Sequence, residues 1–419
     1  MSGEASVGTL GLLRLGASLF VDRVWRRSRA DAGNVICRWA RARSVEGGDI
    51  FIHVFRRAYL LVASSNSSRV ILDASPAADA LPPGRSKREA MSFLAPRALT
   101  IAHGPDWVRL REFHERVLAF DEQHPLAQRF LAQVRAAFAT PVRSGEDVRA
   151  AMAQAMRAIV PGDADPRVSS DVHAMFQAVQ SPVQRRLLGI RYRPIRRRLY
   201  AFLRNRVRQP PAADVGNLLD LARTSDPPAD EDEFIQQIPH WMFTFTGSGT
   251  DLLTRTLAMI TARPAVHQRV LDELVAAGGP DQAATVGGLR YLESCLLETG
   301  RLFPPVRQTF HRSTDGDREI VHYFPLLHRD PALGAAVDAF RPERWLEPAL
   351  DPAAAASSLF LRGPRSCPGQ ALILFVCKAA LARQLGEIGM RVQTTRLSTD
   401  PLPVTFPEAD ARFHPEERS

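Results

Sequence analysis

The sequence predicts a mainly α-helical fold with a small β region, and two observations support this. Between Asp49 and Ser64, apolar and polar residues alternate, which is the two-residue period of a half-buried strand. Elsewhere, apolar residues recur at helical spacing, and prolines separate the helical segments because proline lacks the N–H that a helix interior needs. Proline pairs stand at residues 82–83, 210–211, 227–228 and 304–305.

The number of domains follows from where the candidate functional residues lie. A chain of 419 residues has the length of two or three domains of ordinary size. Candidate cofactor-binding residues nevertheless extend from Trp107 to Gly369 and point to one site, and no internal repeat is evident. We therefore expect one large domain over residues 1–419, and a monomer.

The cysteines and the N-terminal residues predict a cytoplasmic location. Four cysteines at irregular spacing match neither a disulfide framework nor a zinc site. The apolar stretch at residues 8–21 contains Arg14 and is shorter than the roughly 20 residues that span a bilayer. It also lacks the cleavage pattern of a signal peptide. We expect no membrane anchor.

The net charge of +9 raises the question of nucleic-acid binding, because much of it lies between residues 185 and 209. Tyr192 and Phe202 stand among these arginines, where aromatic rings can stack on bases. The leucines of this stretch recur at helical spacing, however, which favours an amphipathic helix with a solvated basic face. We expect no nucleic acid, and a basic surface that attracts an acidic protein partner.

A ten-residue segment, FLRGPRSCPG at Phe360–Gly369, has the composition of a haem-binding loop. A thiolate at Cys367 is a strong axial ligand for haem iron. Gly363 and Gly369 allow the backbone to approach a flat ring closely. Arg365 can pair with a haem propionate. The apolar stretch after this loop has helical length, and the positive end of a helix there would stabilise the thiolate.

This segment resembles the FxxGxRxCxG signature of the cytochromes P-450 at every specified position. The resemblance implies a P-450 fold in which haem b lies between a long central helix and the Cys367 loop, with Phe360, Gly363 and Arg365 at the haem. The absence of an anchor makes the chain similar to the soluble bacterial members.

A second motif lies in YLESCLLETGRLFPPV, at residues 291–306. Glu298 and Arg301 are three residues apart, so a helix over 291–302 places them on one face, where they can pair. The string resembles the ExxR helix of the cytochromes P-450. The resemblance implies a structural role for this pair, joined by Arg344 of the segment AFRPERWL.

Further haem contacts are predicted upstream and downstream. Trp107 and Arg111 are one helical turn apart, and an indole N–H with a guanidinium suits the haem carboxylates. Their position resembles that of the WxxxR pair in the family's C helix. His311 stands where many relatives place another propionate-binding residue, and Arg307 or Arg312 can serve in its place.

The long helix expected over residues 234–261 is the segment that most affects chemistry. Relatives commonly carry an AGxDT-like stretch there, in which a glycine makes room for O₂ and an acid and a threonine organise proton delivery. This chain has the string TGSGTDL, at residues 246–252, in that region.

No register of this string supplies both the acid and the alcohol. If Gly247 is the glycine, Thr250 is the threonine and Gly249 takes the place of the acid. If Gly249 is the glycine, Asp251 is the acid but Leu252 replaces the alcohol.

A third register, counted back from Pro264, makes Ser248 the alcohol. Proton delivery is therefore expected from Thr250 or Ser248 with water, from Asp251, or from the substrate. In the alternative interpretation, the two hydroxyls only donate to helical carbonyls.

One stretch is shorter than its counterpart in the family. Between His311 and Leu326 part of a β-hairpin is apparently missing, so substrate contacts there cannot be transferred from relatives. Substrate choice is expected to depend on residues 75–100 and 170–190.

The resemblance implies a monooxygenase that hydroxylates or epoxidises a small, largely apolar substrate with O₂, and secondary metabolism is the expected setting. Because no flavin domain is present, two electrons must come from a ferredoxin and its reductase with NAD(P)H. The incomplete acid–alcohol pair leaves open a peroxygenase, a desaturase or a rearrangement enzyme. A haem sensor without turnover is a further alternative.

Overall fold

The structure is a computed structural model of the chain. It describes residues 5–7, 32–44, 48–54, 56–73, 81–162, 165–180, 182–210, 214–313, 316–392, 396–408 and 411–415. The apolar stretch at 8–21 lies outside these residues. In the described part of the chain, no helix is both long enough and apolar enough to cross a membrane.

The contacts divide the chain into two compact units. Unit 1 comprises Met1–Lys87, Leu297–Ser366 and Thr399–Pro407. Unit 2 comprises Arg88–Leu296, Cys367–Ser398 and Glu408–Ser419. The single domain over residues 1–419 stays a prediction.

The described elements are mainly helices, which confirms the predicted fold class. Unit 1 contains β1 (Ala5–Val7), α2 (Ala32–Arg41), β2 (Ile50–Val54), β3 (Arg57–Val62), α3 (Ser65–Asp73), β4 (Gln308–Arg312), β5 (Arg318–Tyr323), α16 (Phe324–Leu327) and α17 (Pro352–Ala355). Unit 2 contains α5 (Gly104–Leu118), α6 (Ala127–Ala137), α7 (Gly145–Ile159), α8 (Pro166–Gln180), α9 (Pro182–Arg208), α10 (Leu218–Thr224), α11 (Glu231–Thr244), α12 (Thr250–Thr261), α13 (Pro264–Ala276), α14 (Ala283–Gly288), α18 (Gln370–Ala382), β6 (Met390–Val392) and β7 (Phe413–Pro415). Two helices contain a boundary between the units. In α4 (Arg85–Leu94) it falls after Lys87, and in α15 (Arg290–Leu302) it falls after Leu296.

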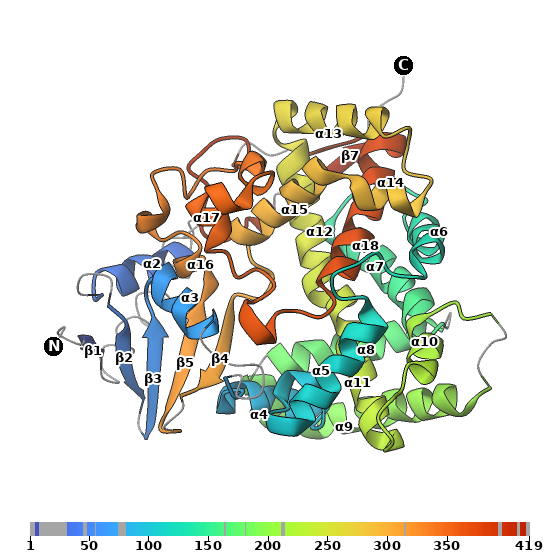
Figure 1. The fold of residues 1–419 in the computed structure, drawn as a ribbon, viewed down its shortest axis with the longest axis horizontal. Helices are drawn as coiled ribbons and strands as arrows, with labels where there is room; N and C mark the ends of the chain where they lie inside the picture. The colour runs from blue at the N-terminus through green and yellow to red at the C-terminus, as the bar shows by residue number, and fades with distance from the viewer. Residues whose placement is uncertain are drawn as a thin grey trace. The chain divides into compact units, whose positions relative to one another are not determined.

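Unit 1 is built on a five-stranded sheet in the order β1-β2-β3-β5-β4 (Figure 1). The alternating segment at residues 49–64 forms the antiparallel pair of β2 and β3, as predicted. Strand β3 then pairs in parallel with β5, a partner more than 250 residues later in the chain. Ile50 and Val62 are fully buried in this unit.

The stretch after His311 forms a hairpin. Strands β4 and β5 pair antiparallel, with His311 opposite Ile320. Helix α16 begins at Phe324, directly after β5. This direct connection leaves few residues between His311 and Leu326.

In unit 2, α18 is the central helix of the core. Its residues from Leu372 to Ala382 are all buried, which its almost continuous apolar sequence requires. It contacts α6, α12 and α14, and also a π-helical turn at Phe245–Gly249. The helix expected over residues 234–261 consists of α11, this π turn and α12 in direct succession.

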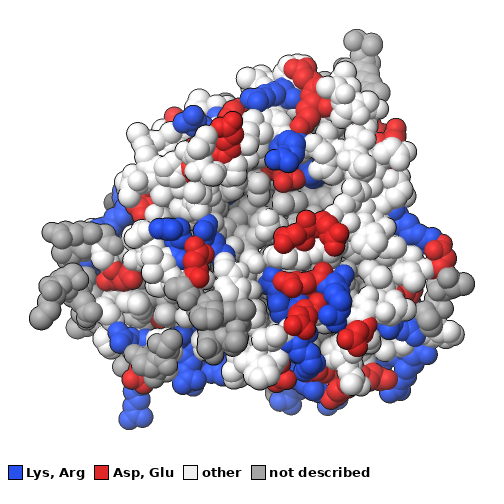
Figure 2. Space-filling model, viewed as in Figure 1, with Lys and Arg blue, Asp and Glu red and all other residues white. Residues whose placement is uncertain are grey.

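The basic stretch forms the long helix α9, and four of its ten arginines are paired with acids in the described residues. Arg204 bonds Asp232 at 3.0 Å, and Arg208 bonds Glu231 at 2.9 Å. Arg198 pairs with an aspartate of α8. On the face shown in Figure 2, basic and acidic side chains are interspersed. Part of the positive charge on α9 is therefore balanced by nearby acids.

Candidate functional site

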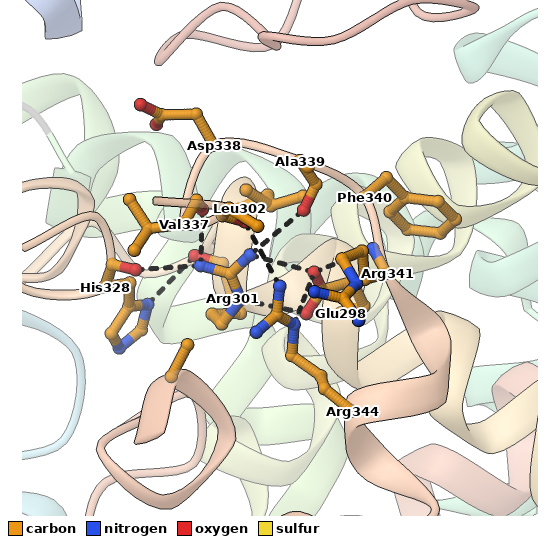
Figure 3. A network of polar contacts seen from close by, with 12 residues as sticks. Glu298, Arg301, Leu302, His328, Val337, Asp338, Ala339, Phe340, Arg341 and Arg344 are labelled. Carbon is orange, nitrogen blue, oxygen red and sulfur yellow. Dashed lines mark hydrogen bonds and ion pairs between the residues drawn. The ribbon is translucent and has the colours of Figure 1, made fainter. Parts of the chain in front are cut away.

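The motif on α15 forms a buried ion-pair network in unit 1. Arg301 and Arg344 both bond the Glu298 carboxylate (Figure 3). The distances are 2.8 Å from each of two Arg301 nitrogens and 3.0 Å from Arg344 Nε. Glu298 and Arg301 are completely buried. The structure thus brings the three predicted residues together.

Two more donors complete the environment of Glu298. The backbone N–H of Arg341 donates to its Oε1 at 3.0 Å, and the indole N–H of Trp345 donates to its Oε2 at 2.9 Å. Burial alone would raise the pKa of Glu298, but Arg301 and Arg344 hold it below its usual range. Sequence reasoning missed Trp345, although it follows Arg344 directly.

Arg301 also anchors the following loop. Its Nη1 donates to the backbone oxygens of His328 and Val337 at 2.8 and 2.9 Å. His328 Nδ1 in turn lies 3.0 Å from the Arg301 carbonyl oxygen, and the N–H of Ser358 donates to its Nε2. The network therefore positions the chain that leads to residue 360.

Residues 360–366 of the segment at 360–369 lie in unit 1 and pack against α3. Gly363 has a φ of +63°, and a Cβ there would lie 2.2 Å from the Leu72 carbonyl oxygen. Arg362 pairs with Asp73 at 3.0 Å, which ties the loop to the end of α3. Phe360 is half-buried. Only glycine fits the position of Gly363.

Cys367 stands in unit 2, three residues before α18, and it is half-buried. Burial raises the pKa of its thiol, while the N–H of Gly369 and the charge of Arg111 lower it. Burial is the largest of these effects, so the pKa of the thiol lies above its ordinary value, and a thiolate here needs a further positive partner such as a metal ion.

Trp107 and Arg111 lie on α5, and both are buried. Arg111 Nε donates to the Glu115 carboxylate at 2.6 Å, and its guanidinium lies 4.7 Å from the ring centroid of Phe120. The charge of Arg111 lowers the pKa of the Cys367 thiol, but burial raises it by more.

His311 and Arg365 belong to a cluster of basic side chains in unit 1. His311 is 1% exposed, and neither of its ring nitrogens has a hydrogen-bond partner within the described ranges. Its pKa lies well below the usual value because of burial and then the charges of Lys87, His322 and Arg365. Burial, with the charge of Arg365, lowers the pKa of Lys87 to about 8. Sequence reasoning missed both Lys87 and His322.

The hydroxyls of the central helix bond backward. Thr250 Oγ1 donates to the Phe245 carbonyl oxygen, five residues earlier, at 2.8 Å, and Thr250 is 1% exposed. Ser248 Oγ lies 3.4 Å from the Thr244 carbonyl oxygen, and Ser248 is half-buried. These contacts agree with the alternative interpretation of the two alcohols.

Asp251 and the two glycines of the π turn have other neighbours. Asp251 pairs with Arg255 at 3.0 Å, at the surface of α12. A Cβ at Gly247 would lie 2.5 Å from the ring of Phe176, and one at Gly249 would lie 2.7 Å from Ile373. The glycines therefore allow α8 and α18 to pack closely on the turn.

The residues present fit a haem group. A buried histidine with two unpartnered ring nitrogens, beside further basic groups, suits a dianionic ligand such as the two propionates. A half-buried thiol at the start of α18 suits an iron atom. Among the described residues, no cluster of His, Cys, Asp or Glu forms a metal site of another kind.

Comparison with curated proteins gives distant relatives. The probable cytochrome P450 28c1 of Drosophila melanogaster is 30% identical over 40% of this chain and 37% of its own length. The cytochrome P450 monooxygenase sphH of Aspergillus fumigatus is 27% identical over 50% of this chain and 44% of its own length. The chain thus matches less than half the length of each relative.

Comparison with solved structures gives a match over nearly the whole chain. The retinoic acid-bound cyanobacterial CYP120A1 superposes with a TM-score of 0.72 at 18% identity, covering 93% of this chain and 95% of that one. This match shows the fold. The family model described as Cytochrome P450 matches residues 235–401, which include Glu298, Arg301 and Cys367. The chain is therefore similar to the cytochromes P450 over residues 235–401 and has their fold.

Proposed function

We propose that this protein is a haem-thiolate monooxygenase that inserts one oxygen atom from O₂ into a small, largely apolar organic substrate. Two electrons would come from a ferredoxin and its reductase with NAD(P)H. The observation that carries the proposal is the half-buried Cys367 thiol, close to the Arg111 charge and to the start of α18.

The side chains around the cofactor have separate roles in this proposal. Cys367 would ligate the iron, and Arg111, Trp107, His311 and Arg365 would hold the propionates. Phe360 and Gly363 shape the loop. When bound, haem b supplies the activation of O₂, and the thiolate promotes cleavage of the O–O bond.

Proton delivery is the step in which this chain differs from the pattern of its relatives. We propose that the hydroxyls of Ser248 and Thr250 would hold a water molecule that supplies protons to the reaction. Ser248 is the more accessible of the two, because it is half-buried while Thr250 is 1% exposed. Asp251 stays a candidate acid, and its pairing with Arg255 would have to open first.

The iron-ligand assignment is tested by the carbon monoxide spectrum of the reduced protein. The wild type is expected to give the thiolate-type band, and Cys367→Ala is expected to lose it because no other described cysteine precedes α18 in this way. Cys377→Ala is the matched control, since Cys377 is fully buried in the same helix and should leave the band intact. Retention of the band in Cys367→Ala would contradict the proposal.

A second candidate is a peroxygenase or another haem-thiolate activity, favoured by the incomplete acid–alcohol pair of residues 246–252. The two are separated by product formation with reductase, ferredoxin and NAD(P)H compared with hydrogen peroxide alone. We expect product with the electron-transfer partners. Product with peroxide only would favour the second candidate.

A further inference from the structure

Two buried histidines of unit 1 have ring nitrogens that no protein atom satisfies. His311 on β4 is 1% exposed, and neither of its ring nitrogens has a hydrogen-bond partner in the described part of the chain. His322 on β5 is completely buried, and its Nε2 also has no partner among the described residues. Buried polar atoms are nearly always hydrogen-bonded, so these three nitrogens require an explanation.

The sheet places the two rings together. In the antiparallel pair of β4 and β5, Thr309 lies opposite His322 and His311 lies opposite Ile320. His311 and His322 are therefore diagonal neighbours on one face of the sheet. Their ring centroids are 5.5 Å apart, with an angle of 69° between the ring planes. At this separation, one buried water molecule can join a nitrogen of each ring.

The other nitrogen of His322 is bonded to a serine of α3. Ser68 Oγ lies 3.0 Å from His322 Nδ1, and Ser68 is itself buried. Helix α3 is held in place at its start, because the N–H and the hydroxyl of Ser65 donate to the Asp330 carboxylate at 2.8 and 2.9 Å. Ser68, His322 and His311 thus form a row inside unit 1.

The hydroxyl proton of Ser68 decides the direction of hydrogen bonding along this row. Burial lowers the pKa of His322 to about 4, so at neutral pH its ring has one N–H and one acceptor nitrogen. If Nδ1 carried the proton, the Ser68 hydroxyl would need another acceptor, which the described residues do not supply. If Ser68 donates to Nδ1 instead, His322 carries its proton on Nε2, the nitrogen that can donate towards His311.

We propose that Ser68 and His322 are positioning residues that fix the tautomer of His311. The Ser68 hydroxyl donates to His322 Nδ1, and His322 Nε2–H donates through one buried water to a nitrogen of His311. The neutral His311 ring then carries its proton on its other nitrogen. This inference rests on the proposed function, in which His311 contacts a haem propionate. The row makes the free end of His311 a hydrogen-bond donor, as a carboxylate requires.

Nitrogen NMR of the haem-free protein, enriched in nitrogen-15 at histidine, shows which ring nitrogen carries each proton. Signals are assigned by their loss in His311→Phe and in His322→Phe. We expect His322 to be protonated on Nε2 and His311 to be protonated on a single nitrogen. Ser68→Ala should change the tautomer ratio of His322 by about tenfold, the effect of losing one hydrogen bond, and should leave His311 as a mixture of two tautomers.

The chain supplies two controls for this measurement. His328 is the internal reference, because its Nδ1 donates to a backbone carbonyl and its Nε2 accepts a backbone N–H, each at 3.0 Å. It should be protonated on Nδ1 in the wild type and in Ser68→Ala. Asn66→Ala, which alters an exposed residue of the same helix, should change none of these tautomers. A proton on His322 Nδ1 in the wild type, or unchanged ratios in Ser68→Ala, would overturn the proposal.

A titration with haemin and with haemin dimethyl ester, whose carboxylates are blocked, tests the consequence for the cofactor. Ser68→Ala is expected to weaken haemin binding by about fivefold and to leave ester binding unchanged. Equal loss for both would mean that Ser68 acts through the structure, and no loss for either would mean that the row does not affect the ligand; both overturn the inference. Failure of the proposed function would instead appear in the wild type, as the absence of a thiolate-type carbon monoxide band.

Discussion

At the scale of single residues, Glu298 shows how a common pair becomes part of the core. Its carboxylate accepts hydrogen bonds from Arg301, Arg344, Trp345 and the backbone of Arg341. An exposed Glu–Arg pair at this spacing is worth less than ~1 kcal/mol. A completely buried carboxylate is tolerated only when every lone pair is satisfied, so removing any one partner is far more costly than the exposed pair suggests.

Gly363 gives a prediction at the same scale. Alanine there must adopt a φ of +63° and bring its Cβ within 2.2 Å of the Leu72 carbonyl oxygen. We expect Gly363→Ala to lower the free energy of unfolding by at least about 2 kcal/mol, from backbone strain and overlap together. Urea unfolding of the haem-free protein measures this directly.

Gly189 supplies the matched control for that substitution. It lies in α9, and a Cβ there would have no atom within 4 Å. Because alanine is the better helix former, Gly189→Ala should raise the free energy of unfolding by up to ~1 kcal/mol. Equal effects of the two substitutions would contradict the packing described for the loop.

At the scale of elements, a buried polar contact joins α5 to α11. Trp241 Nε1 donates to His114 Nδ1 at 3.1 Å, so the proton of the neutral ring is on Nε2, which lies 3.3 Å from Gln237 Oε1. Gln237 also bonds the backbone at Arg97 and Leu99. The helix that carries Trp107 is thereby fixed to the helix that leads into the π turn.

This contact predicts a dependence of stability on pH. Burial lowers the pKa of His114 to about 3, from an ordinary value of 6.5. Below pH 6.5 the unfolded chain binds a proton that the folded protein does not, so stability falls as pH falls from 6.5 towards 3. Between pH 7.5 and pH 5 this amounts to about 2 kcal/mol.

The measurement is urea unfolding at the two pH values for the wild type and for His114→Gln, which cannot titrate. We expect the variant to be less stable at pH 7.5 but to lose about 2 kcal/mol less on acidification. An identical pH dependence in both proteins would show that His114 does not stay neutral in the fold.

At the scale of the whole molecule, prediction succeeded where the signal is local. The predicted mainly helical class is confirmed, and so is the strand pair at residues 49–64. Glu298 and Arg301 were placed together because helical spacing alone puts residues three apart on one face. The role of Trp345 was missed because the residues next to it in the sequence do not indicate which acceptor its indole N–H will bond.

The basic cluster in unit 1 was only half predicted for a related reason. His311 and Arg365 stand near recognisable motifs, whereas Lys87 has none around it. Its place depends on residues 82–84 extending the sheet beside β4, a pairing across more than 220 positions. Long-range pairings of this kind leave no mark on local sequence.

The sequence by itself determined the family resemblance, the candidate iron ligand and the missing acid of the central helix, because each depends on residue types within a few positions of one another. Only the tertiary structure decided which side chains share a site and which are engaged elsewhere. It directs Asp251 to Arg255, returns Thr250 to a helical carbonyl and gathers Lys87 with His311 and Arg365. The physical reason is that hydrogen bonding, burial and charge balance are properties of neighbours in space, and the fold chooses those neighbours.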